Sequence, residues 1–125
     1  MNVGMKYTLN FVVTEEITAK VVGSGELEVL ATPMMIAYME KASSLLVKPY
    51  LAEEETTVGT LVNVSHVMAS LVGEKIEVVS ELTLVDRKRL VFSVKAMSEA
   101  GLIGEGTHER FIINSEKFMN KLKNR

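Results

Sequence analysis

The sequence predicts an α+β domain in which an antiparallel five-stranded sheet is wrapped around one long helix. Residues 31–50 form the only long internal stretch in which apolar residues recur at three- and four-residue spacing. From residue 57 onward the period of the apolar residues changes to two, which is typical of strands. The predicted strands are joined by short connections and are therefore antiparallel.

The first 30 residues predict one strand and a flexible entry to the helix. Lys6–Val13 alternates roughly and is rich in β-forming residues, so we expect a strand there. Thr14–Thr18 is expected to be a turn and Ala19–Val22 a short extended piece. Gly23–Gly25 is a flexible break before the helix.

The predicted helix runs from Ala31 to Tyr50 and has clear start and stop signals. Thr32 is a good N-cap residue, and Pro33 occupies the first helical position, where its missing N–H costs nothing. Pro49 ends the helix. Its apolar face consists of Met35, Met39, Ala42 and Leu46, with Ile36 and Val47 beside it. We expect this face to pack against the sheet.

Four further strands follow the helix. They are predicted over Thr57–Met68, Lys75–Val85, Leu90–Ser98 and Leu102–Asn114. In the first of them the even-numbered residues form the more apolar face, which includes His66. Ser115 is expected to cap a tail helix over Glu116–Lys123. One helix cannot cover a five-stranded sheet, which predicts a dimer that buries the rest.

Composition predicts a single soluble domain over residues 1–125. The net charge of −2 provides no basic excess for nucleic-acid phosphates. No apolar run approaches the roughly 20 residues of a membrane-spanning helix, and the N-terminus lacks the plan of a secretory signal. With no cysteine, the chain has no disulfide framework, thiolate nucleophile or cysteine-based zinc site. We expect a cytoplasmic protein without nucleic-acid or membrane partners.

Two side chains depart from the apolar faces on which they lie. Glu40 lies beside the apolar stripe of the helix, either as a partly exposed edge acid or as a carboxylate that acts as nucleophile or base. His66 is either a core histidine bonded to a backbone carbonyl or a general acid or base, because a histidine pKa of about 6.5 suits proton transfer near neutral pH. Capping alone explains Thr32 at this point.

Two further positions invite a functional interpretation. Gly59 lies in a strand where a side chain would normally pack, which often marks a bulge or the close approach of a ligand. His108, Glu109 and Arg110 alternate across the last predicted strand. Arg110 could bind a phosphate, and the alternative is that these side chains form a solvated strand face. Two histidines without a close spacing make a metal site unfavourable, so none is predicted.

Four segments together resemble a known family: VLATPMMIAYMEKAS, VKPYL, ETTVGTLVNVSH and GEGTHERF. They are similar to the fluoroacetyl-CoA-specific thioesterase-like branch of the hotdog-fold thioesterases, over about Tyr7 to Ile113. The most specific signature is A-T-P, a Glu eight residues after that Thr, T-T-V-G-T, and a His 26 residues after that Glu.

The resemblance implies a hotdog fold and hydrolysis of an acyl-CoA at a dimer interface. In the family a Thr at the helix start, a Glu on the helix and a strand His form the catalytic group, and a glycine N–H holds the thioester carbonyl. Matched by motif, these are Thr32, Glu40, His66 and Gly59. Glu40 would attack the carbonyl or activate water, and the sequence leaves both open. The resemblance implies no cofactor, since CoA is part of the substrate, and a homodimer with further pairing into a tetramer left open.

One departure from the family concerns the acyl group. The specialised enzymes are associated with aromatic lid residues before the catalytic Thr, whereas Ala19–Ala31 contains no aromatic residue. We therefore expect a short or medium acyl-CoA substrate. Two alternatives stay open: a non-catalytic acyl-CoA-binding protein with the same groove, and a hotdog enoyl-CoA hydratase in which an acid and a histidine act on C–C chemistry.

Overall fold

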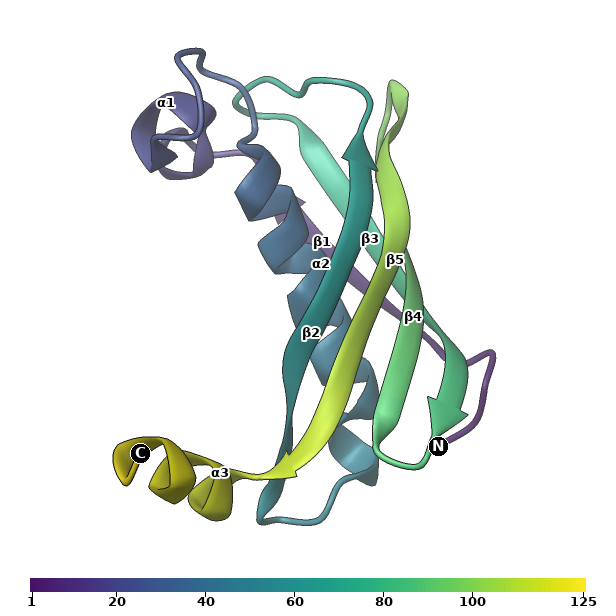
Figure 1. Cartoon of the computed structure of the whole chain (residues 1–125). Coiled ribbons are helices and arrows are strands. Elements are labelled where there is room, and N and C mark those ends of the chain that lie inside the picture. Colours follow the sequence, from purple (N-terminus) through teal and green to yellow (C-terminus); the bar gives the residue numbers. More distant parts are fainter.

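A computed structural model describes all 125 residues and shows a five-stranded sheet curled around one long helix (Figure 1). The strands are β1 (Lys6–Val12), β2 (Glu55–His66), β3 (Lys75–Asp86), β4 (Arg89–Ser98) and β5 (Gly101–Asn114). Their order in the sheet is β1-β3-β4-β5-β2, and every neighbouring pair is antiparallel. The predicted α+β architecture is confirmed.

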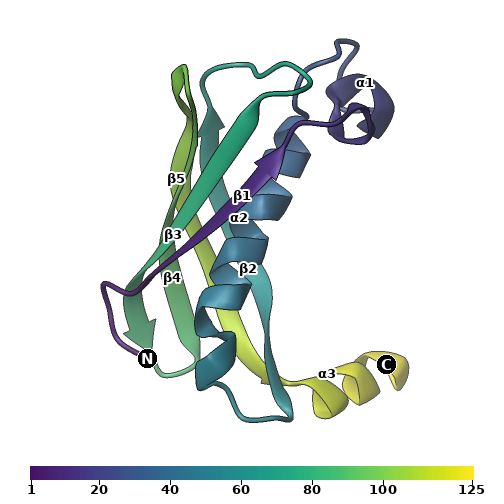
Figure 2. The same cartoon turned by 180° about the vertical axis from the view of Figure 1, so that it is seen from behind.

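The central helix is α2 (Thr32–Val47), which a 3-10 turn, η2 (Lys48–Tyr50), continues. The other helical pieces are η1 (Glu15–Ile17), α1 (Ala19–Val22) and α3 (Ser115–Lys123). In both views α1 lies near the start of α2 and α3 near its end, and both project away from the body of the sheet (Figures 1 and 2). None of these helices has the length and apolarity that crossing a membrane requires.

The core lies between α2 and the concave face of the sheet. The predicted apolar face of the helix is buried there, namely Met35, Met39, Ala42 and Leu46. The sheet contributes Ile76, Val78, Leu82, Leu90, Phe92, Val94 and Ile103. Full burial of one such large side chain contributes roughly 1.5–3 kcal/mol, so this contact holds the helix in place.

A bulge in β2 changes which residues face the helix. Between Gly59 and Leu61 the pairing of β2 with β5 shifts by one residue, so that Thr60 is an extra residue. After the bulge the even-numbered residues face α2 as predicted, but before it the odd-numbered Thr57 and Gly59 do. Gly59 and His66 would lie on opposite faces of a regular strand. Because of the bulge, both face α2.

Two local predictions at helix ends are wrong. The segment Ala19–Val22 is a helical turn and not an extended piece, because the Thr18 hydroxyl accepts a hydrogen bond from the Val21 N–H at 3.4 Å. The tail helix is capped by Asn114, whose Oδ1 accepts from the Lys117 N–H at 3.0 Å. The predicted cap, Ser115, is instead the first residue of α3.

The close contact between β5 and β2 requires a glycine at position 106. A Cβ atom there would collide with the Asn63 carbonyl oxygen and lie 2.6 Å from the Val64 Cα, both of them backbone atoms of β2. We expect Gly106→Ala to lower the free energy of unfolding by more than about 2 kcal/mol. In the control Gly25→Ala, the added Cβ atom would contact only the Ala19 Cβ, at 3.3 Å. This control should change the free energy of unfolding by less than about 1 kcal/mol. Urea unfolding compares them, and equal midpoints would contradict the expectation.

Candidate active site

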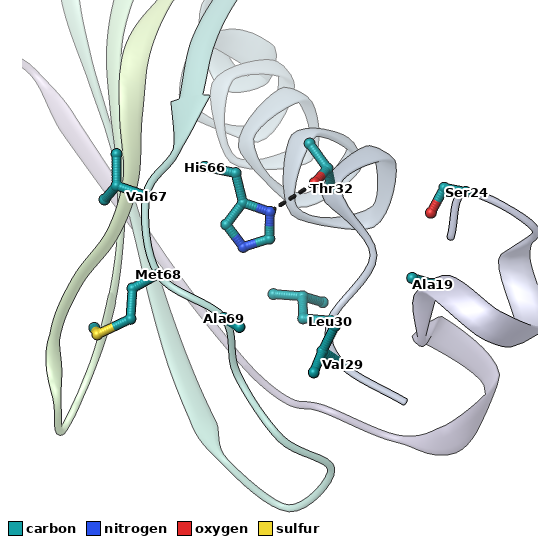
Figure 3. A pocket seen from close by; sticks show the side chains of 9 residues that line it. All are labelled: Ala19, Ser24, Val29, Leu30, Thr32, His66, Val67, Met68 and Ala69. Atoms are coloured by element: carbon teal, nitrogen blue, oxygen red, sulfur yellow. Dashed lines mark hydrogen bonds between the residues drawn. The ribbon is translucent and has the colours of Figure 1, made fainter. Parts of the chain in front are cut away.

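The first part of the site is a contact between Thr32 and His66. Thr32 begins α2, His66 ends β2, and the Thr32 Oγ1 lies 2.7 Å from the His66 Nδ1 (Figure 3). The predicted capping role of Thr32 is wrong, because Ala31 is the N-cap residue and no side chain caps the helix. The Thr32 hydroxyl is free to meet His66 for that reason.

A pocket of about 260 Å³ adjoins this pair. Besides Thr32 and His66 it is lined by Ala19, Ser24, Val29, Leu30, Val67, Met68 and Ala69. Figure 3 shows the His66 ring between the start of α2 and the residues that follow β2. The Nε2 of His66 is buried and makes no hydrogen bond within the chain. This nitrogen is therefore a polar atom beside the pocket that has no partner within the chain.

Burial keeps His66 in its neutral form near neutral pH. Desolvation lowers the pKa of His66 from its ordinary value of 6.5, and the nearby Met68 backbone opposes this to a smaller extent. A neutral imidazole can accept a proton, so the protonation state suits a general base.

The second part of the site lies further along α2, where Glu40 faces Gly59 and Arg110. The Glu40 Oε2 is 3.7 Å from the Arg110 Nη1. A Cβ atom on residue 59 would lie 3.0 Å from the same carboxylate oxygen, so the glycine leaves room for it. The side chain of Glu40 is 41% exposed and that of Arg110 only 10%. The pair thus joins a buried cation to an acid that reaches the surface.

Arg110 is held mainly by neutral partners. Its Nε donates to the Thr57 hydroxyl at 2.8 Å, and its Nη2 donates to the Thr57 carbonyl at 3.0 Å. Its Nη1 lies 3.2 Å from the His108 Nε2. Desolvation lowers the pKa of Arg110, and the Glu40 carboxylate raises it in part. The solvated strand face is thus wrong for Arg110 and for His108, and a phosphate contact by Arg110 stays a prediction.

The two parts of the site are separate within one chain. Thr32 and Glu40 are eight residues apart on α2, which is about 12 Å along the helix axis at roughly 1.5 Å per residue. The structure therefore brings Thr32 to His66, and Glu40 to Gly59, without bringing all four together. Sequence reasoning missed His108 as a partner of Arg110. The available signal was its position two residues before Arg110, on the same face of β5.

The two histidines predict how stability depends on pH. Burial lowers the pKa of both His66 and His108 below 6.5, so below that pH the unfolded chain binds more protons than the folded one. We expect the free energy of unfolding to be lower at about pH 5 than at about pH 7.5. Urea unfolding at both pH values measures this. A variant with both His66→Gln and His108→Gln should show a smaller difference in the free energy of unfolding between the two pH values. An unchanged difference would contradict the lowered pKa of these histidines as its cause.

Comparison with known proteins identifies the family. Residues 13–116 match the family described as fluoroacetyl-CoA-specific thioesterase. The fluoroacetyl-CoA thioesterase of Streptantibioticus cattleyicolor is 37% identical over an alignment of 129 residues, gaps included. The alignment covers 98% of this chain and 93% of that protein.

Solved structures agree with this match. A structure of the fluoroacetyl-CoA thioesterase superposes with a TM-score of 0.94 at 35% identity, covering 100% of this chain and 97% of that one. A Thermus thermophilus protein described as a thioesterase superfamily member gives 0.90 at 30% identity, covering 98% and 91% of the two chains. These findings confirm the predicted hotdog thioesterase fold. The chain therefore belongs to the fluoroacetyl-CoA-specific thioesterase family and is a thioester hydrolase of the hotdog fold.

Proposed function

We propose that this protein hydrolyses a short or medium acyl-CoA to the free acid and CoA, at a site that two subunits complete. The observation that carries the proposal is the contact between Thr32 and His66 beside a pocket of mostly aliphatic side chains, in a chain of this family. A threonine-to-serine variant of the fluoroacetyl-CoA thioesterase has been solved with acetyl-CoA, which supports an acyl-CoA as the substrate class. No cofactor is required, because CoA is part of the substrate.

The residues suit attack on a thioester carbonyl. Attack places negative charge on the carbonyl oxygen, and a fixed backbone donor such as the Gly59 N–H stabilises that charge; loss of one such donor typically costs roughly 100- to 1,000-fold in rate. Glu40 would either attack the carbonyl and expel the CoA thiolate, leaving a mixed anhydride for water to open, or activate water directly. The His66 Nε2 would accept a proton from water or return one to the thiolate. Thr32 would keep the ring in line through its bond to Nδ1.

The pocket supports an acyl group of modest size. Its volume of about 260 Å³ and its small aliphatic lining suit a short chain. Residues 19–31, which supply part of this lining, contain no aromatic side chain. A wall without aromatic residues has little means of distinguishing a fluorinated acyl group, which supports the broader substrate range. The cytoplasmic location and the further pairing of dimers stay predictions from the sequence.

The edge strand β2 supports a homodimer. This strand has a partner on one side only, and its Leu61 and Val62 are 49% and 42% exposed. Unpaired edges of this kind pair readily with a second copy. Two copies of β2 would pair in antiparallel fashion about a two-fold axis at Asn63. Because Thr60 is an extra residue at the bulge, this axis would bring Gly59 opposite the partner subunit's His66, with both positions on the inner face. Each site would then combine the Thr32–His66 pair of one subunit with Glu40 and Gly59 of the other.

Release of free thiol from acyl-CoA substrates tests the reaction and the carboxylate. We expect Glu40→Ala to lower kcat by at least about 100-fold, because a positioned acid–base group or nucleophile is lost. The matched control is Glu53→Ala, an exposed acid on the loop before β2, which should keep the wild-type rate. Wild-type activity in Glu40→Ala would remove Glu40 from the mechanism, and no thiol release by the wild type from any acyl-CoA would defeat the proposal.

The same assay tests the acyl group. Acetyl-, butyryl-, hexanoyl- and fluoroacetyl-CoA are compared by kcat/KM, each divided by its uncatalysed hydrolysis rate to remove the intrinsic reactivity of the fluorinated thioester. We expect the corrected values for acetyl- and fluoroacetyl-CoA to lie within about tenfold of each other. A strong preference for fluoroacetyl-CoA after this correction would contradict the expected substrate range.

Mixed dimers test how the subunits share the site. Thr32→Val and Glu40→Ala should each be inactive as homodimers, and Thr32→Val should fold normally because its hydroxyl caps nothing. A dimer with one subunit of each kind would contain one intact site, with Thr32 and His66 from one chain and Glu40 from the other. We expect such a dimer to recover about half of the wild-type activity. If mixing restores no activity although size analysis shows mixed dimers, the shared site is wrong.

A further inference from the structure

The inner face of β5 carries a buried histidine that the proposed reaction does not use. His108 is 1% exposed, and its ring stacks on Phe92 with the ring centroids 6.1 Å apart. Its two nitrogens face different partners. The Nδ1 lies 2.8 Å from the Leu61 carbonyl oxygen, and the Nε2 lies 3.2 Å from the Arg110 Nη1.

These partners define the tautomer of His108. A carbonyl oxygen can only accept a hydrogen bond, so the proton must be on Nδ1. A guanidinium can only donate, so Nε2 must present its lone pair to Arg110. Burial is the largest influence on the pKa of His108 and lowers it; the hydrogen bond to the Leu61 carbonyl opposes this, and the nearby Arg110 charge lowers the pKa further. The neutral ring therefore accepts a hydrogen bond from Arg110 through Nε2 and donates one to the Leu61 carbonyl through Nδ1.

His108 contacts the one nitrogen of Arg110 that faces Glu40. The other bonds of the guanidinium, from Nε and Nη2, both go to Thr57. Only Nη1 approaches the Glu40 carboxylate, at 3.7 Å, and only His108 accepts a hydrogen bond from Nη1. The imidazole therefore contacts the part of the guanidinium that faces Glu40, while Thr57 holds the other two nitrogens.

We propose that His108 is a positioning residue for thioester hydrolysis: by accepting a hydrogen bond from Arg110 Nη1 it holds the guanidinium against Glu40 and so keeps the carboxylate beside Gly59. The inference rests on the role proposed above for Glu40. A displacement of about 1 Å in a reacting group can cost roughly 100-fold in rate, so the position of this carboxylate matters. The bond from Nδ1 to Leu61 also ties the ring to the bulge next to Gly59.

Two substitutions separate the two bonds of the imidazole. The side-chain oxygen of Gln reaches about as far as Nε2, so His108→Gln keeps an acceptor for Arg110. The side-chain nitrogen of Asn reaches about as far as Nδ1, so His108→Asn keeps a donor for Leu61 and loses the acceptor. We expect His108→Asn to lower kcat by about 10- to 100-fold with KM changed by less than about threefold. His108→Gln should stay within about threefold of the wild-type kcat.

Thermal unfolding distinguishes this role from a structural one. Both variants lose the stacked ring and one hydrogen bond, so we expect similar decreases in Tm. A merely structural histidine would give similar kcat values for the two variants, and that result would overturn the proposal. If His108→Asn does not fold, Arg110→Lys provides the second test. It keeps a positive charge but loses the planar fork, so kcat should again fall, and a wild-type kcat would overturn the proposal.

The Glu40→Ala background separates this inference from the proposed function. Without the carboxylate there is nothing to position, so adding His108→Asn to Glu40→Ala should leave the residual rate unchanged. A further decrease equal to that seen in the wild-type background would overturn the role through Glu40. Loss of thiol release in the wild type itself would instead defeat the proposed function. An active wild type with equal His108→Gln and His108→Asn variants would defeat only the inference.

Discussion

The rest of the structure depends on how closely α2 lies against the concave face of the sheet. At its start the helix touches β5, where a Cβ atom on Gly104 would lie 2.5 Å from the Met35 Sδ. Near its middle it faces β2 at Gly59, where a Cβ atom would crowd Glu40. These two glycines let the backbone of the sheet approach the helix. The site residues can therefore meet across the gap with short side chains such as Thr32.

The two charged groups of this site lie in different surroundings: Arg110 is buried and Glu40 is partly exposed to solvent. A buried guanidinium normally costs several kcal/mol unless its donors are satisfied. Arg110 meets this requirement through Thr57 and His108, which are uncharged, and leaves Glu40 partly exposed at 3.7 Å. The carboxylate is thus near a cation without being fully locked in a buried ion pair. The role proposed for Glu40 needs that accessibility.

Much of the fold could be predicted from the sequence, because hydrophobic period alone distinguishes a 3.6-residue helix from a 2-residue strand. The same pattern singles out Glu40 and His66 as candidates, since each interrupts an apolar face. Gly59 also indicates a bulge or the close approach of a ligand, and the structure has a bulge between Gly59 and Leu61. The pattern could not predict that this bulge brings Gly59 and His66 to the same face of β2. The contact of Thr32 with His66 spans 34 residues and depends on how the chain folds back. The burial of His108 was missed because its polar neighbours on β5 suggested a solvated face.

The segment that precedes α2 contributes less to stability than the rest of the site does. Residues 20–28 are all exposed and belong to no strand, yet Ser24 among them lines the pocket beside His66. Substitutions there remove little buried surface, so they change stability little. The residues proposed to react, by contrast, lie on α2 and β2, which pack around the core. Under the proposed function, substrate range can therefore evolve, or be engineered, in an exposed segment while Thr32, Glu40 and His66 keep their places.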